Sequence, residues 1–560
     1  MNVLSSVSSP QVAAALAAAM KLPAPPPVQA VDYVSAGKTL IVGPAEVVLG
    51  WAERLKDRLD VQVLLTDARG DEALPLRADY VLSAGSNVRL DGWLGAFRAN
   101  WRDVALPDGD VVGAVDFLGG VPREEKFDLV FDLSPEALIR IPHPPQGYFH
   151  AGRDPLEQFD AALKLTGFIG EFEKPRYFDY KADQCAHARN RIDGCSNCID
   201  VCSTKAIRAD GNGVIVEPHL CMGCGACASA CPSGAMRYNY PSVPELGMRL
   251  KAMLAAFREA GGAQPVVLFH DRKGEDWLLR LAYRNGLPEN VIPFGVHDIA
   301  GIGPDLLLAA LCYGATHVAL LQVTDMPEAY VRNLHAQVAL VDKILHGLGY
   351  VGMHCELFDR SAGRQDALVF RIEAWQLPPA VFNVFVDKRR TLDFCIDHVL
   401  KHAPQPADEI VLPAGSPFGT LNVDSDRCTL CMACVGACPS KALQDNPETP
   451  QLRFIENNCV QCGICVETCP EKAVTIAPRL LLTPEAKKAR VLNEAQPFHC
   501  VRCGKPFGTR ALVDSMLKRL SGHSLFADAA ALRRLQMCGD CRVVDMMENR
   551  QEMTVEDLPR

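Results

Sequence analysis

The chain has 560 residues, of which 48% are hydrophobic and 22% charged, so it has material for about three or four globular domains. Its formal net charge of −10 argues against general binding to nucleic acid, which usually needs a basic surface. The 23 cysteines are too clustered, in too long a chain, for a secreted disulfide scaffold. We therefore expect a multidomain cytoplasmic protein whose thiols stay reduced.

Two apolar segments resemble membrane-associated sequences but lack their other features. Residues 12–20 have no basic residue before them, so they are expected to form a helix or a tail rather than a signal peptide. Residues 306–323 are interrupted by Gly314, Thr316 and His317, which favours a helix followed by a buried strand over a membrane span. The prediction is a protein with no membrane span, which leaves peripheral docking open.

After a proline-rich linker at residues 23–27, strands and helices are expected to alternate through residues 31–140. The expected buried strands are residues 39–42, 61–65, 79–82 and 128–131, and residues 46–59 have helical periodicity. This alternation predicts a small α/β domain with a parallel sheet. The turn at Gly43 lacks the pattern of a dinucleotide-binding loop, so a structural role is expected.

Three later segments have the spacing Cys-x2-Cys-x2-Cys-x3-Cys-Pro. In this pattern the first three cysteines bind one iron–sulfur cube, and the fourth binds the cube of a neighbouring motif. They are residues 221–232, 428–439 and 459–470. A fourth copy, at residues 195–202, has Ile192 where its first thiolate is expected, and Ser203 where the others have proline. Zinc prefers pairs of Cys-x2-Cys, so the spacing favours four 4Fe-4S clusters.

Exchange of the fourth cysteine between neighbouring motifs predicts four sets of ligands. The first two sets are Cys428, Cys431, Cys434 and Cys469, and Cys459, Cys462, Cys465 and Cys438. The third set is Cys221, Cys224, Cys227 and Cys202. The fourth set joins Cys195, Cys198 and Cys231 to Cys185, which is the obvious substitute for the missing thiolate. The alternative is a three-iron (3Fe-4S) or labile cluster with Cys185 free.

The flanks of the four motifs also repeat, which indicates duplication. A small–apolar pair follows each fourth cysteine: Ala206-Ile207, Ala235-Met236, Ala442-Leu443 and Ala473-Val474. Residues 181–240 and 421–478 each resemble the bacterial two-4Fe-4S ferredoxin family. The resemblance implies two ferredoxin-like domains that pass single electrons between redox protein partners. The whole arrangement also resembles large multi-cluster ferredoxin-type proteins of proteobacteria that accompany formate dehydrogenases, which implies such an enzyme as a partner.

Residues 246–395 are expected to form a second α/β domain. Its expected helices are residues 246–259, 275–284, 305–311 and 328–345, and its expected strands are residues 266–269, 291–294 and 317–323. This order predicts a parallel sheet. Residues 265–355 resemble the hydrogenase delta-subunit family in the order of elements, which implies a docking role. Thr324 and Asp325 stand where that family has a cluster cysteine, so no ligand is expected here.

Residues 396–420 are expected to lead to the second cysteine domain, and residues 495–545 hold a different pair of motifs. These are Cys500-x2-Cys503 and Cys538-x2-Cys541, separated by an expected helix at residues 509–520. Two such pairs predict a zinc-ribbon-like element with one tetrahedral zinc, and a mononuclear rubredoxin-like iron is the alternative. The isolated Cys312, Cys355 and Cys395 are expected to be small core residues.

The predicted fold class is therefore α+β multidomain, with two ferredoxin-like modules, two α/β domains and a C-terminal four-cysteine element. No catalytic set, phosphate loop or flavin fingerprint is recognisable, so an active site of its own is not supported. The leading hypothesis is a polyferredoxin-type carrier that relays single electrons between an oxidoreductase and another carrier. The alternatives are an iron–sulfur accessory or maturation factor for a metalloenzyme, and a reductase subunit with its substrate in the middle domain.

Overall fold

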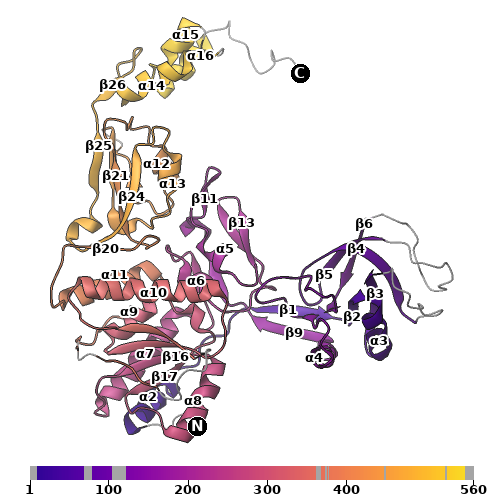
Figure 1. Ribbon diagram of the computed structural model, residues 1–560. Coiled ribbons are helices and arrows are strands. Elements are labelled where there is room, and N and C mark those ends of the chain that lie inside the picture. Colours follow the sequence, from indigo (N-terminus) through magenta and orange to yellow (C-terminus); the bar gives the residue numbers. More distant parts are fainter. Residues whose placement is uncertain are drawn as a thin grey trace.

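The computed structural model describes residues 9–67, 79–103, 122–360, 368–372, 375, 377–446, 449–521, 523, 526 and 528–548. Within these ranges the chain forms two α/β domains, two small cysteine modules and a C-terminal element (Figure 1). The second cysteine module lies between the middle domain and the C-terminal element, and the N-terminal domain projects to one side. The mixed α and β character predicted from the sequence is confirmed, with both parallel and antiparallel sheets.

The N-terminal domain is built on a seven-stranded sheet with the order β6-β5-β4-β3-β2-β7-β8. Its strands are β2 (Lys38–Pro44), β3 (Asp60–Asp67), β4 (Val81–Asp91), β5 (Phe97–Asp103), β6 (Pro122–Phe127), β7 (Leu129–Asp132) and β8 (Tyr148–His150). The segment from β4 to β8 is parallel, as predicted, and β5 and β6 extend it in antiparallel order. Strand β6 was not predicted because five of its six residues face at least partly outward and its sequence has no apolar run.

Both faces of this sheet are buried. Along β2, Leu40 and Val42 join one hydrophobic core and Ile41 joins the other, because successive side chains point to opposite faces of a strand. Helices α3 (Ala45–Leu55) and α4 (Pro155–Leu165) pack on the Ile41 face. An antiparallel ribbon of β1 (Ala30–Ser35) and β9 (Gly170–Pro175) connects this domain to the rest of the chain (Figure 1).

The apolar segment near the N-terminus is helix α2 (Pro10–Met20), which packs against the middle domain. Val12, Ala15 and Leu16 are buried in the core of that domain, beside helix α7 (Val243–Glu259). The expectation of a helix is therefore confirmed for this segment. None of the helices in the described part of the chain is long and apolar enough to cross a membrane.

The middle domain has a four-stranded, entirely parallel sheet with the order β17-β16-β18-β19. Its strands are β16 (Val266–His270), β17 (Val291–Gly295), β18 (His317–Gln322) and β19 (Cys355–Asp359), and its further helices are α8 (Arg272–Asn285), η2 (Ile299–Gly301), α9 (Pro304–Cys312), α10 (Glu328–Gly347) and α11 (Lys388–Lys401). All the helices and strands predicted for this domain are confirmed. Helix α9 is buried along its whole length, which explains why it is apolar on every side.

Helix α11 crosses the expected end of the middle domain at residue 395. Cys395, Ile396 and Val399 are buried in the same core as α9, so the helix continues the domain instead of leading away from it. The apolar residues of α11 recur at helical spacing, but the predicted boundary at residue 395 cut through this helix. We propose that the middle domain extends to residue 401.

The first cysteine module is framed by the antiparallel pair β10 (Phe178–Tyr180) and β15 (Met236–Tyr238). Between them lie η1 (Ala182–Gln184), β11 (Ala188–Arg189), β12 (Ile192–Asp193), α5 (Asn197–Val201), β13 (Ile207–Asp210), β14 (Gly213–Val216) and α6 (Ala226–Ala230). The second module repeats this plan with β21 (Gly419–Val423) against β24 (Val474–Leu481). It also contains β20 (Glu409–Val411), α12 (Ala433–Ala437), β22 (Leu443–Gln444), β23 (Gln451–Phe454), η3 (Glu456–Asn458), α13 (Ile464–Thr468), η4 (Pro484–Lys487) and β25 (Arg490–Glu494).

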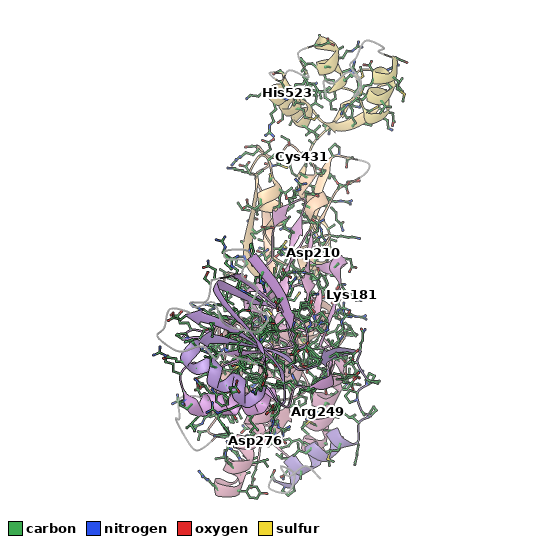
Figure 2. The ribbon with its side chains drawn as sticks, turned by 90° about the vertical axis from the view of Figure 1, so that its right-hand side faces the viewer. Lys181, Asp210, Arg249, Asp276, Cys431 and His523 are labelled. Carbon is green, nitrogen blue, oxygen red and sulfur yellow. The ribbon has the colours of Figure 1, made fainter. Side chains whose placement is uncertain are left out.

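The C-terminal element consists of a short hairpin followed by helices. Its elements are β26 (Pro497–His499), β27 (Pro506–Thr509), α14 (Arg510–Leu520), α15 (Ala529–Arg534) and α16 (Gly539–Glu548). The helix predicted at residues 509–520 is confirmed as α14. The element lies beyond the end of the second module that carries Cys431 (Figure 2).

Candidate metal centres

Each of the four cysteine motifs contains one short helix that separates its last two cysteines. Helices α5, α6, α12 and α13 are each five residues long, and they contain Cys198, Cys227, Cys434 and Cys465, respectively. The residue that caps the C-terminus of each helix is the next cysteine: Cys202, Cys231, Cys438 and Cys469. The duplication seen in the sequence is thus also a duplication of backbone structure.

Left-handed backbone conformations recur at equivalent positions of the motifs. In the three complete copies, positive φ angles flank the second cysteine, at Gly223 and Gly225, Leu430 and Met432, and Gln461 and Gly463. In all four copies, the residue three positions after the fourth cysteine also has a positive φ: Lys205, Gly234, Lys441 and Lys472. Such a conformation costs a non-glycine residue about 1 kcal/mol or more. Its recurrence indicates that each loop must curl around a common centre.

This curl directs backbone N–H groups toward sulfur. In five cases the thiol is hydrogen-bonded to the N–H group two residues later: Cys195 with Asn197, Cys221 with Gly223, Cys224 with Ala226, Cys459 with Gln461, and Cys462 with Ile464. Burial raises the pKa of each of these thiols, and the N–H donor counteracts that increase. All-thiol donor sets with inward N–H groups fit 4Fe-4S clusters, whose sulfur ligands carry negative charge.

In the first module the cysteines gather into two groups, which we name site A and site B. Site A comprises Cys202, Cys221, Cys224 and Cys227, and site B comprises Cys185, Cys195, Cys198 and Cys231. Burial raises the pKa of Cys227, and the charges of the other three thiols of site A raise it further. Burial likewise raises the pKa of Cys198, and the charges of Cys231, Cys195 and Cys185 add to the increase. The structure therefore brings Cys185 to the three thiols that lack a fourth partner.

The second module contains two corresponding groups. Site C comprises Cys438, Cys459, Cys462 and Cys465, and site D comprises Cys428, Cys431, Cys434 and Cys469. Burial raises the pKa of Cys465, and the charges of the other three thiols of site C raise it further. Burial raises the pKa of Cys434 to about 12, with added contributions from the charges of Cys431, Cys428 and Cys469. These four groups are the ligand sets predicted from the exchange of the fourth cysteine, and the assignment of each set to one cluster stays a proposal.

The inserted loop before Cys195 folds back on that cysteine. Ala186 O accepts a hydrogen bond from Cys195 N at 2.9 Å, and His187 O accepts one from Gly194 N at 2.6 Å. His187 Nδ1 lies 3.0 Å from the carbonyl oxygen of Cys195, so this ring nitrogen contacts the backbone. Ile192 lies in the hairpin of β11 and β12. The loop thereby returns the chain from Cys185 to Cys195, the next cysteine of site B.

The two cysteine modules meet through their inner sites. An added Cβ on Gly194 would lie only 2.5 Å from Cγ1 of Ile464, so the modules touch at this glycine. Burial is the main cause of the raised pKa of Cys195, which reaches about 12, and Cys462 of the other module contributes to it. Burial also raises the pKa of Cys462, and the guanidinium of Arg189 in the first module counteracts this. Sites B and C therefore face one another.

Two consecutive residues at the start of α11 bind the two modules. The ammonium of Lys388 donates to three carbonyl oxygens of the first module, at Ala228 (3.0 Å), Ser229 (2.6 Å) and Cys231 (3.1 Å). The guanidinium of Arg389 donates to carbonyl oxygens next to the second module and within it, at Pro417 (2.8 Å), Asn457 (2.7 Å) and Cys459 (3.4 Å). Neither residue was predicted from the sequence, because basic residues at a helix start are usually solvated and no local pattern marks these two.

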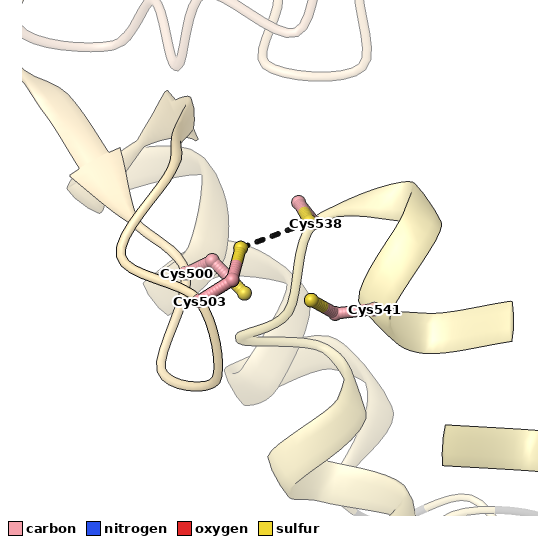
Figure 3. A group of neighbouring side chains, drawn as sticks. All are labelled: Cys500, Cys503, Cys538 and Cys541. Carbon is pink, nitrogen blue, oxygen red and sulfur yellow. Dashed lines mark hydrogen bonds between the residues drawn. The ribbon is translucent and has the colours of Figure 1, made fainter. Parts of the chain in front are cut away.

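The four cysteines of the C-terminal element converge on one point (Figure 3). Their sulfur atoms all lie within 4.8 Å of one another, and the sulfurs of Cys503 and Cys538 are 3.7 Å apart. A tetrahedral zinc with Zn–S bonds of about 2.3 Å would hold its sulfurs roughly 3.8 Å apart. Burial acts to raise the pKa of Cys500, but the N–H groups of Cys503, Cys538 and Arg502 outweigh it and lower the pKa to about 6. The donor set and its spacing fit one four-coordinate ion.

The three isolated cysteines lie apart from these groups. Cys312, Cys355 and Cys395 are 0%, 1% and 0% exposed in the hydrophobic core of the middle domain. Cys312 Sγ lies 3.7 Å from the carbonyl oxygen of Cys395, a contact between two packed helices. Their prediction as core residues is confirmed.

Comparison with known proteins supports the iron–sulfur interpretation of both modules. A family described as a 4Fe-4S dicluster domain matches residues 192–235, and a second family of the same description matches residues 420–470. The thiosulfate reductase electron transfer subunit PhsB of Salmonella typhi is 32% identical over 91 residues, which are 16% of this chain and 43% of that protein. The protein named Ferredoxin 7Fe of Hydrogenibacillus schlegelii is 34% identical over 50 residues, which are 9% of this chain and 63% of that protein.

The chain covers less than two thirds of the length of either relative, and most of its own length lies outside each match. The residues matched by the two families contain the short helices and curled loops described above. The chain thus carries two 4Fe-4S dicluster domains of the ferredoxin type, one over residues 192–235 and one over residues 420–470.

Proposed function

We propose that the protein is a polyferredoxin-type carrier that relays single electrons through four 4Fe-4S clusters, in the spatial order A, B, C and D. The observation that carries the proposal is the contact between the modules at Gly194 and Ile464, which brings Cys195 of site B close to Cys462 of site C. Two separate ferredoxin modules would each serve their own partner. Two modules that meet through their inner sites support one continuous path.

Site D is the proposed point of exchange with an external carrier. Cys431 is exposed, and it lies at the end of the second module that faces the C-terminal element (Figure 2). That element contacts the module where Thr509 Oγ1 donates to the carbonyl oxygen of Thr429 at 3.0 Å. A zinc-stabilised element at this position would help to dock a redox partner beside site D.

The proposed partner is an oxidoreductase, with a formate dehydrogenase as the specific case implied by the sequence resemblance. One relative is named as the electron transfer subunit of a reductase, which supports this class of partner. The likeness of the middle domain to the hydrogenase delta-subunit family stays a prediction, and with it a docking role for that domain. A cytoplasmic location also stays a prediction.

The cluster count is tested by iron analysis of protein purified without oxygen, which should give about sixteen irons per chain, four for each of four cubes. A markedly lower value would overturn the four-cluster proposal. The order of the sites is tested by electron paramagnetic resonance of the fully reduced protein, where neighbouring reduced clusters broaden each other's signals. We expect broadening between clusters of the two modules as well as within each module.

The variant Gly194→Val is designed to separate the modules, because its side chain would collide with Ile464. We expect it to reduce the coupling between modules and to slow electron equilibration from site A to site D. Gly436→Ala is the matched control, because a Cβ at Gly436 meets nothing within 4 Å. If Gly194→Val loses iron, Arg389→Met separates the modules from the other side of the junction. Unchanged coupling and equilibration in a variant with all its iron would contradict the path.

The partner is identified by an anaerobic pull-down of the tagged native protein. An oxidoreductase in the eluate that reduces the clusters with its own substrate would support the relay and name the donor. Assembly factors or an immature apo-enzyme, without such reduction, would overturn the relay in favour of a maturation role.

A further inference from the structure

Ser203 lies at the centre of a chain of hydrogen bonds that ends on a thiol of site A. The other three motifs have proline at this position, at Pro232, Pro439 and Pro470, and a proline side chain has no hydrogen-bonding group. Ser203 Oγ is hydrogen-bonded to the hydroxyl of Tyr330 and lies 2.8 Å from Nδ1 of His143. The hydroxyl of Tyr330 in turn donates to Cys224 Sγ at 2.9 Å.

The three side chains come from three different parts of the protein. His143 belongs to the proline-rich passage after the N-terminal sheet, Ser203 to the first cysteine module, and Tyr330 to the first turn of α10 in the middle domain. Ser203 is 4% exposed and Tyr330 is 2% exposed, so water does not compete for the hydrogen bond between their hydroxyls, whereas His143 reaches Ser203 from the surface. Helix α10 also contacts the module through α5 and α6, which holds Tyr330 in place.

The direction of each hydrogen bond follows from counting protons. A thiolate bound to a cluster has no proton, so it can only accept, and Tyr330 must donate to it. The Tyr330 oxygen then accepts the single proton of Ser203, and the Ser203 oxygen accepts from Nδ1–H of His143. Each hydrogen bond therefore points from donor to acceptor in the order His143, Ser203, Tyr330 and Cys224, and each of these protons has an acceptor.

We propose that Tyr330 is a tuning residue for site A, whose hydroxyl raises the reduction potential of the cluster there by donating to Cys224, and that Ser203 and His143 orient it. When site A gains one electron, the added negative charge on the sulfurs strengthens this hydrogen bond, and the proton stays on Tyr330. Hydrogen bonds to sulfur are a known determinant of cluster potential. The inference rests on the proposed function, because it requires site A to hold a cluster.

This proposal assigns a role to the middle domain. Tyr330 is supplied by α10 and not by the ferredoxin-type module, so the potential of site A depends on how these two bodies are docked. The first motif has serine at position 203 where the other motifs have proline. The chain of hydrogen bonds requires this serine, since a proline there would remove the group that orients Tyr330.

The test is a redox titration of the whole protein, followed by electron paramagnetic resonance, for wild type and for Tyr330→Phe. We expect the midpoint potential of one cluster to become more negative, while the other three potentials and the iron content stay unchanged. Tyr350→Phe is the matched control: Tyr350 is also buried in the middle domain, and its hydroxyl donates to the carbonyl oxygen of Val399 at 2.8 Å. All four potentials should be unaltered in this control.

Ser203→Ala keeps the tyrosine and removes only the group that orients it, so it provides a second test if Tyr330→Phe loses a cluster. We expect a smaller negative shift of the same cluster, and no further shift when Ser203→Ala is added to Tyr330→Phe. Pulsed resonance after exchange into D2O should show one coupled deuteron fewer in Tyr330→Phe. Unchanged potentials with full iron would overturn this inference alone, whereas missing iron in the wild type would overturn the four-cluster proposal itself.

Discussion

Lys388 and Arg389 are neighbours in the sequence, yet their side chains bind different cysteine modules. The ammonium of Lys388 donates to the carbonyl oxygen of Cys231, a thiol residue of site B, and the guanidinium of Arg389 donates to that of Cys459 in site C. The first turn of α11 therefore connects the backbones of the two inner sites. One helix of the middle domain thus holds both modules through adjacent side chains.

Replacing Lys388 with Met should weaken the attachment of the first module. The buried ammonium donates to three carbonyl oxygens and lies near the buried Asp305, so its loss removes one donor from each oxygen and a cation from the surroundings of that carboxylate. We expect the unfolding free energy to fall by about 2–4 kcal/mol. Chemical denaturation without oxygen measures this change, and hydrogen exchange at residues 228–232 should accelerate.

Arg390→Met is the matched control for this variant. Arg390 is the next residue of α11 but is exposed, and its guanidinium stacks on Phe385 at 4.2 Å. Its loss should cost less than about 1 kcal/mol. Equal effects of the two variants would show that Lys388 has no special role in docking.

Replacing Cys185 with Ser tests the assignment of the missing ligand. Because Cys185 lies with Cys195, Cys198 and Cys231, we expect the variant to convert site B to a three-iron cluster or to lose that cluster. Iron analysis and resonance spectra measure the change. Cys465→Ser, in a complete motif, is the comparison and should remove one cluster signal. An iron content and spectra in Cys185→Ser that equal those of the wild type would instead favour a wild-type cluster that does not use Cys185, such as the three-iron alternative.

Metal analysis should find about one zinc per chain in addition to the iron. Cys503→Ser should abolish zinc binding and leave the iron content unchanged, because the four C-terminal thiols lie in an element separate from sites A to D. Cys355→Ala, which alters a buried core thiol, should retain all metals. One additional iron with no zinc would show the rubredoxin-like alternative to be correct.

The middle domain should lose stability in mild acid because of His354. This side chain is 1% exposed and packs against Trp375, with ring centroids 4.6 Å apart. Burial, together with the nearby His346, lowers the pKa of His354 from 6.5 to about 4. Between these values the unfolded chain binds a proton that the folded chain does not, so the contribution is complete above pH 6.5 and is lost as the pH falls toward 4.

After allowance for solvent screening, we expect a loss of about 1–2 kcal/mol from this group. Denaturation at pH 7 and pH 5 should show that His354→Phe reduces the difference in unfolding free energy between the two conditions. His335→Gln, which changes an exposed histidine of α10, should leave that difference as in the wild type. An unchanged difference in His354→Phe would contradict the prediction.

The cysteine spacing was enough to predict which thiols would share a cluster. The spacing of a motif such as residues 221–232 restricts three sulfurs to one loop, and the helix that follows carries the fourth to a neighbouring site, so the outcome depends on a few adjacent residues. The same is true of the strands and helices of the middle domain, whose apolar periodicity is local. The proposal of Cys185 as the substitute also came from the local sequence, because the motif was one thiol short and one cysteine stood nearby.

How the sites are linked, and which side chains surround them, depends on long-range packing that no sequence pattern revealed. Gly194 meets Ile464, Lys388 binds the carbonyl oxygen of Cys231, and Tyr330 donates to Cys224, all between residues more than 100 positions apart. A tyrosine or a lysine on a helix face carries no local sign of the partner that it will reach. Such contacts arise when whole faces pack together, and that packing depends on the shapes of complete domains.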